Sequence, residues 1–185
     1  MQTDQMDKKG ALVFTLKAWP VVALATIGLC CLTQVVAGWT GVALPDQANV
    51  EFVKRSLMNA FASSDHFIYA ACLVANVLVL APVVEELVFR GLLFKLPGKI
   101  GAQVFRKTIG RGLVAFAVFS SAVFSAAHYI RQPWPDAAFL ALFFFGLAQC
   151  WIYRKTERIW CAMLNHFLFN LTNLVLMFVL PGAAT

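Results

Sequence analysis

The stretch NVLVLAPVVEELVFRGLLF, from Asn76 to Phe94, embeds two adjacent acids, Glu85 and Glu86, and a base, Arg90, in an apolar run. Its length is close to the ~20 residues that an α-helix needs to cross the hydrocarbon core of a membrane. An ionisable group at bilayer depth is destabilising by about 2.5–3.5 kcal/mol on insertion scales, so such groups are rare and usually belong to a working site. This segment therefore predicts a spanning helix that carries functional side chains.

The composition of the whole chain points to the same class of protein. Of its 185 residues, 61% are hydrophobic and 13% are charged, whereas a soluble domain has about half apolar and about a quarter charged residues. We therefore expect an all-α integral membrane bundle of about five transmembrane helices that forms one domain over 1–185. The five cysteines lie in or beside apolar runs and form no Cys-x-x-Cys pair, which favours packing over disulfides or metal binding.

Five apolar segments predict the spanning helices. They are Ala18–Trp39, Phe67–Phe94, Leu113–Ile130, Ala137–Tyr153 and Ile159–Leu180. The length of the first segment favours an uncleaved anchor over a signal peptide, with residues 1–17 as a cytoplasmic tail and 18–39 as the first transmembrane helix. The helical pattern at 50–58, between the first two segments, predicts a helix along the outer membrane interface.

The basic residues alternate between the two sides of these segments. Three precede the first span, six lie between the second and third, and three lie between the fourth and fifth, which leaves three for the outer segments. By the positive-inside rule, the N-terminus is then cytoplasmic and the C-terminus lies outside. This distribution explains the sequence pI near 9.3 without a nucleic-acid partner.

Two further patterns place polar groups inside apolar segments. Phe124-x-x-x-His128 lies in the third segment, and His166-x-x-x-Asn170 lies in the fifth. Residues four apart share one face of a helix, so each pair is expected to point in one direction. Together with the two acids, these patterns predict one buried site assembled from three helices.

The two acids of the first motif point about 100° apart on a helix and can do different work. Glu86 can form an ion pair with Arg90 one turn later and support the structure. Glu85 is then left to face the other helices and take a proton from water. One imidazole would orient that water or protonate the leaving amine, and Asn170 would donate to the developing oxyanion. This set predicts a hydrolase without a side-chain nucleophile.

Each motif taken alone also has a structural interpretation. An intramembrane histidine or asparagine is often a hydrogen-bond partner between helices. Ser120, Ser121 and Ser125 lie near His128, but they favour close helix packing over a Ser–His pair. The chain contains neither Gly-x-Ser-x-Gly nor His-Glu-x-x-His. The order of the three motifs along the chain is therefore more informative than any one of them.

That ordered triple resembles the CPBP family, also called Abi, which includes type II CAAX prenyl endopeptidases and bacteriocin-processing or immunity proteins. The resemblance covers about 81–174, within a family-like core of about 67–180, and residues 85–91 read Glu-Glu-Leu-Val-Phe-Arg-Gly. It implies an intramembrane endopeptidase of the glutamate type. The residues that it implies as catalytic are Glu85, His128, His166 and Asn170, and the supporting ones are Glu86, Arg90 and Phe124.

The resemblance also bears on cofactors and partners. It favours a metal-independent mechanism without a cofactor, and a metal held by Glu85, His128 and His166 is the less favoured alternative. The implied partners are a protein or peptide substrate at the membrane and the lipid bilayer of a prokaryotic inner membrane, with no nucleic acid. The chain carries no signal of its oligomeric state. The alternatives are a non-proteolytic immunity or scaffold protein of the same family, and a small transporter, which would predict an internal repeat that the sequence lacks.

Overall fold

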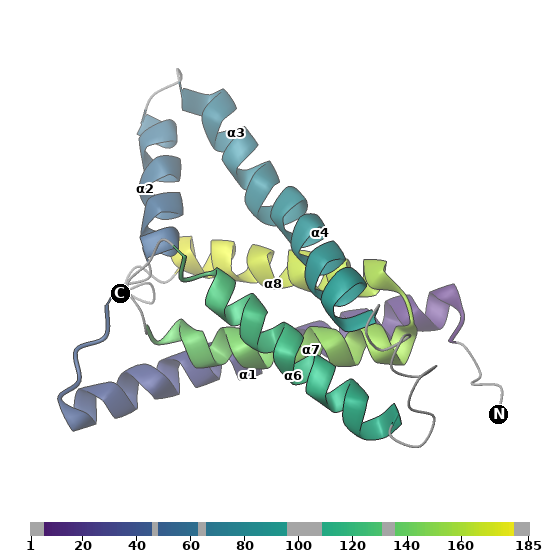
Figure 1. The fold of residues 1–185 in the computed structure, drawn as a ribbon. Coiled ribbons are helices and arrows are strands. Elements are labelled where there is room, and N and C mark those ends of the chain that lie inside the picture. Colours follow the sequence, from purple (N-terminus) through teal and green to yellow (C-terminus); the bar gives the residue numbers. More distant parts are fainter. Residues whose placement is uncertain (1–5, 46–47, 63–65, 96–108, 131–135, 180–185) are drawn as a thin grey trace.

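A computed structural model describes residues 6–45, 48–62, 66–95, 109–130 and 136–179, and within these ranges the regular structure is helical (Figure 1). The predicted all-α class is confirmed. The α-helices are α1 (Lys8–Thr40), α2 (Ala48–Ala62), α3 (Phe67–Ala75), α4 (Ala81–Glu86), α6 (Ile109–Ala127), α7 (Ala138–Thr156) and α8 (Ile159–Val179). Two π-helical stretches, η2 (Asn76–Leu80) and η3 (Leu87–Lys95), flank α4.

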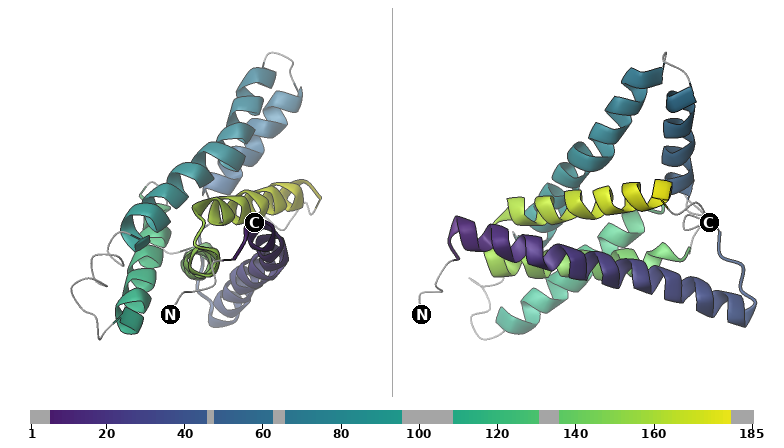
Figure 2. Two further views of the ribbon diagram at one scale, coloured as in Figure 1. Left: turned by 90° about the vertical axis from the view of Figure 1, so that its right-hand side faces the viewer. Right: turned by 180° about the vertical axis from the view of Figure 1, so that it is seen from behind.

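The helices α1, α7 and α8 run side by side, and α6 packs across α7 (Figures 1 and 2). The elements from α3 to η3 follow one another without a break and form a single slanted rod. The short helix α2 lies across the far end of α8, where Leu57 and Ala60 pack with Ala70 and Met177. This direction suits the interfacial position predicted for the segment at 50–58, which stays a prediction.

Local capping sets the bounds of α1. The Asp7 carboxylate accepts a hydrogen bond from the Gly10 backbone N–H at 2.7 Å, and Gly41 ends the helix in the left-handed conformation at φ 71°. The cap starts the helix at Lys8, well before the apolar segment that begins at Ala18, because an N-cap carboxylate satisfies a backbone N–H that has no partner inside the helix. Lys8 and its neighbours are therefore helical, and not an extended tail.

Two contacts fix the register of α1 along α8. The Cys161 thiol lies 3.8 Å from the Ala11 carbonyl oxygen, and the Trp19 indole N–H donates to the Thr172 hydroxyl at 3.1 Å. Both contacts join residues about 150 positions apart in the sequence. The two helices therefore run parallel, with the stretch from Ala11 to Trp19 facing the first three turns of α8.

The chain is a helical membrane bundle. Among the described helical segments, Lys8–Thr40, Phe67–Lys95 and Ile159–Val179 are long and apolar enough to cross a membrane, and Leu113–Ala127 is a shorter apolar helix. Large apolar side chains on the outside suit contact with lipid: Val21 and Leu24 on α1 are 67% and 73% exposed. The count of five spans stays a prediction. The end predicted for the last span at Leu180 lies outside the described residues.

The prediction that the third helix continues to Ile130 is wrong. The helix α6 ends at Ala127, and the backbone N–H groups of His128 and Tyr129 donate to carbonyls only three residues earlier, at 3.2 and 3.0 Å. The Asp136 carboxylate accepts hydrogen bonds from the Tyr129 hydroxyl and from the Ala138 backbone N–H. This link joins the ends of α6 and α7 and holds the tight turn in which His128 lies.

Candidate active site

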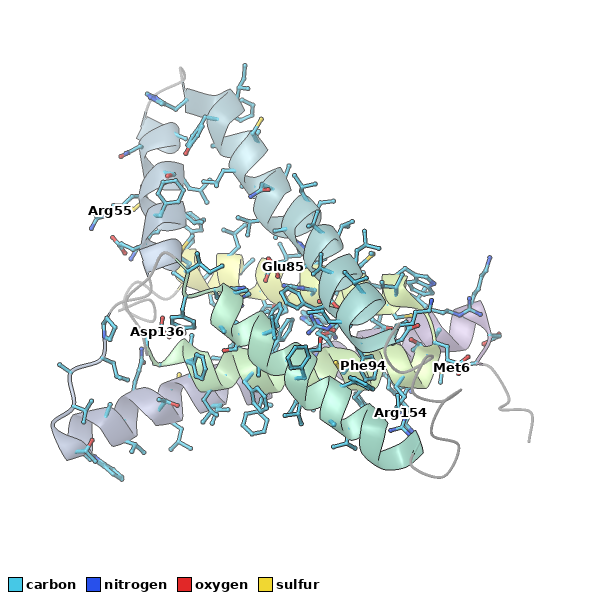
Figure 3. All side chains as sticks on the ribbon, viewed as in Figure 1. Met6, Arg55, Glu85, Phe94, Asp136 and Arg154 are labelled. Carbon is cyan, nitrogen blue, oxygen red and sulfur yellow. The ribbon has the colours of Figure 1, made fainter. Side chains whose placement is uncertain are left out.

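The two acids occupy the short helix α4, between the two π-helical stretches. The side chain of Glu86 is completely buried, whereas that of Glu85 is 27% exposed. Figure 3 places Glu85 in the interior of the bundle, where α4 packs against α8. The angle of about 100° between successive helical residues thus gives the two carboxylates different surroundings.

The predicted ion pair of Glu86 and Arg90 is present and fully buried. Arg90 Nε lies 3.1 Å from Glu86 Oε2. It is a charge contact and not an aligned hydrogen bond, since neither atom makes a hydrogen bond within the described ranges. Arg90 Nη2 donates to the carbonyl of Gly146 on α7 at 3.2 Å, and Arg90 Cζ lies 4.7 Å from the centre of the Phe124 ring. The pair therefore ties the rod to α6 and α7.

His166 bridges the two acids. Its Nδ1 lies 2.9 Å from Glu86 Oε1, and its Nε2 lies 3.7 Å from Glu85 Oε2. A carboxylate only accepts hydrogen bonds, so Nδ1–H donates to Glu86, and in the neutral imidazole Nε2 is then the unprotonated nitrogen. Sequence reasoning assigned Glu86 to Arg90 alone and missed this second contact, which joins residues 80 positions apart.

Asn170 lies one turn after His166 on α8, as predicted. Its Nδ2 donates to the backbone carbonyl of Val77 in η2 at 2.9 Å. A carboxamide has two N–H groups, so this bond leaves a second N–H for a reacting carbonyl. The contact also links α8 to the rod directly ahead of the acids.

Phe124 is the common neighbour of both histidines. Its ring centre lies 4.7 Å from that of His128 and 6.0 Å from that of His166, and its side chain is fully buried. The His128 Nδ1–H donates to the Phe124 carbonyl at 2.8 Å. Although His128 lies just beyond the end of α6, this bond keeps it beside Phe124, as the predicted shared face required.

The three motifs therefore meet around Phe124, and the comparison with known families agrees with their order. A model of the type II CAAX prenyl endopeptidase Rce1-like family matches residues 67–172, more than half of the chain. The chain belongs to the CPBP family. The match runs from α3 into α8, so it contains every predicted site residue, and α1 and α2 precede it. Comparisons with curated proteins and with solved structures find no match.

Sequence reasoning missed other polar side chains in this CPBP family member. Gln149 on α7 and Asn165 on α8 are fully buried, and neither amide has a hydrogen-bond partner in the described part of the chain. The signal was available, because both are polar residues inside apolar segments. Ser120, predicted to serve only close packing, donates to the Phe89 carbonyl of η3 at 2.7 Å.

The donor set does not suit a metal ion. Within the described ranges, no group of three or more His, Cys, Asp or Glu residues is placed to hold one. Both nitrogens of His166 face carboxylate oxygens, and Glu86 faces Arg90 as well. Structural or catalytic zinc needs at least three converging protein ligands, so the chemistry below is derived from the side chains alone.

Proposed function

We propose that this CPBP family member is an intramembrane endopeptidase that hydrolyses a peptide bond of a membrane-associated or secreted substrate. Its nucleophile is a water molecule activated by Glu85. The observation that supports this most is the bridge made by His166, with Nδ1 at 2.9 Å from Glu86 and Nε2 at 3.7 Å from Glu85. A base oriented by a second carboxylate is the arrangement that proton transfer in hydrolases uses repeatedly.

Burial separates the roles of the two acids. Both oxygens of Glu86 are engaged, one by His166 and one by Arg90, and the residue is 0% exposed. A reacting water therefore cannot reach Glu86. Glu85 is 27% exposed and lies beside the unprotonated nitrogen of His166. Glu85 is thus the carboxylate that can bind a water and a substrate.

The reaction balances with these groups. The water oxygen attacks the scissile carbonyl carbon while Glu85 accepts one of the water's protons. Negative charge develops on the carbonyl oxygen, where the second N–H of Asn170 can donate. As the C–N bond breaks, the leaving nitrogen takes a proton from Glu85 or through His166. The products are a carboxylic acid and an amine, with both groups returned to their starting protonation states.

We also propose that the protein is a multi-pass protein of a prokaryotic inner membrane, with a cytoplasmic N-terminus and an external C-terminus. Figure 3 shows Met6, Phe94 and Arg154 at one end of the bundle and Arg55 and Asp136 at the other. Lys8 and Lys95 are near neighbours of the first group in the sequence. Basic side chains thus gather at the end with Met6, which supports its assignment to the cytoplasm.

The test compares new peptide termini in membranes of cells that express wild-type protein or Glu85→Gln. General-base catalysis contributes about 10²–10⁴-fold, so cleavage by Glu85→Gln should fall at least about a hundredfold at equal expression and thermal stability. Glu51→Gln is the matched control, because Glu51 is a glutamate on α2 that pairs with Arg55 at the surface. Undiminished cleavage by Glu85→Gln would sink the proposed base, and no cleavage by the wild type would favour the immunity or scaffold alternative.

A further inference from the structure

A proline interrupts the rod that carries the acids. Pro82 lies inside the continuous helical run from Phe67 to Lys95, one turn before Glu86. Proline has no backbone N–H, and its ring clashes with the carbonyl four residues earlier in an α-helix. The π-helical stretch η2 ends directly before Ala81, which is where a helix must widen to accept that ring.

The widening leaves the carbonyl of Val77 without a backbone donor. Ala81 N–H, which would reach Val77 in an α-helix, donates instead to Asn76, five residues back. The donor that would reach Val77 in this π register is residue 82, and it is the proline. A carbonyl without a donor is strongly unfavourable within a bilayer, where no water replaces the lost bond.

Asn170 supplies the missing donor. Its Nδ2 lies 2.9 Å from the Val77 oxygen and comes from α8. Because the carboxamide is planar, fixing one N–H fixes the direction of the other N–H and of the oxygen. Asn170 lies one turn after His166, whose ring reaches both acids. The carbonyl opened in η2 thus sets the orientation of a polar group at the edge of the site.

We propose that Pro82 is a positioning residue, which keeps the Val77 carbonyl open so that Asn170 is held in the orientation needed to donate to the developing oxyanion. This inference rests on the proposed function and extends it to a side chain that touches no reacting atom. It explains why a residue that disfavours helices stands within the rod, so close to the acids.

The substitution Pro82→Ala returns an N–H to position 82, and the backbone can then take the Val77 carbonyl for itself. Alanine is far the better helix former, so the melting temperature should equal or exceed that of wild type. The Asn170 amide loses its anchor. We expect kcat to fall about tenfold or more with KM changed less than twofold, short of the about 10²–10³-fold loss seen when an oxyanion donor is removed. Pro20→Ala is the matched control, since Pro20 lies inside α1, before the family match; its kcat should equal that of wild type.

A thermal-stability cycle with Asn170→Ala tests the same link without any proteolysis. In the wild-type background, Asn170→Ala leaves the Val77 carbonyl unpaired and should lower the melting temperature. In the Pro82→Ala background, the backbone satisfies that carbonyl, so the same change should lower it by less than half as much. If the wild type cleaves nothing, the proposed function fails, and this cycle still decides whether Pro82 controls the anchor of Asn170.

Three results would overturn the proposal. One is a Pro82→Ala protein with wild-type kcat. Another is a Pro82→Ala protein that does not fold or melts below wild type, because the proline would then serve the fold. The third is an Asn170→Ala loss of melting temperature that is equal in both backgrounds, which would mean that the two residues act independently.

Discussion

The contact of α6 with α7 depends on a single glycine. A Cβ added at Gly146 would lie 2.9 Å from Ser121 Cβ, 3.0 Å from its Cα and 3.0 Å from its Oγ. Distances this short do not occur between packed atoms, and a Cα cannot rotate away as a side-chain tip can. Gly146→Ala must therefore push the two helices apart. The Gly146 carbonyl also accepts the hydrogen bond from Arg90 at 3.2 Å, so this bond should lengthen.

The sign of the stability change follows from two opposing terms. Overpacking a well-packed contact costs about 1–3 kcal/mol, while replacing glycine by alanine in a helix gains up to about 1 kcal/mol. Because a backbone atom is among the obstructions, the upper part of the first range applies, and the net loss should be about 1–2 kcal/mol. Gly28→Ala is the matched control: nothing lies within 4 Å of its added Cβ, so it should gain up to about 1 kcal/mol.

Unfolding in detergent, followed by helical circular dichroism, measures both variants. A second cycle identifies the cause: in a Ser121→Gly background two of the three close contacts are gone, so adding Gly146→Ala should then cost little. Equal or greater stability of Gly146→Ala relative to the wild type would refute the reasoning, because it would mean that α6 and α7 can separate freely or are not so close.

The remaining predictions concern the ion pair, the topology and metal dependence. Glu86→Gln and Arg90→Ala should each lower the stability by about 3–5 kcal/mol, because removing one member of a buried pair leaves the other unpaired; wild-type melting of both would show that the pair is dispensable, and an inactive but fully stable Glu86→Gln would mean that the roles of Glu86 and Glu85 are reversed. A topology reporter fused after Arg106 should be cytoplasmic, and one fused after Thr185 should be external; a cytoplasmic C-terminus would contradict the five-span count. Purified protein should keep its activity after exhaustive chelation and contain well under one metal ion per chain, whereas activity restored only by added zinc would contradict the glutamate mechanism.

Features that depend on local geometry could be predicted from the sequence. The i,i+4 spacing of Glu86 and Arg90 leads directly to the buried pair, and the spacing of His166 and Asn170 places both on one stretch of α8. The apolar runs likewise predicted the helices of the bundle. In each case the physical cause acts within about one turn of helix, or within one segment of uniform composition.

Features that depend on tertiary packing could not be predicted. The second contact of Glu86, with His166, requires knowing how α4 lies on α8. The end of α6 before His128 depends on Asp136, which binds the Tyr129 hydroxyl from beyond the loop. The donor taken by Val77 comes from a helix 93 residues away. None of these pairs has a sequence period or a spacing that would have indicated it.

The register of α1 along α8 has a consequence for the depth of the chemistry in the bilayer. Ala11 faces Cys161 and Trp19 faces Thr172, so His166 lies level with the stretch of α1 that contains Lys17. A lysine ammonium seeks the aqueous boundary of a membrane. Quenching of Trp19 by brominated lipids, in a variant with no other tryptophan, should therefore be stronger from bromines near the headgroups than from bromines at the chain ends. The scissile bond would then be cut within a few turns of the membrane surface, where water enters without a channel and a polar tail of the substrate can stay in solution.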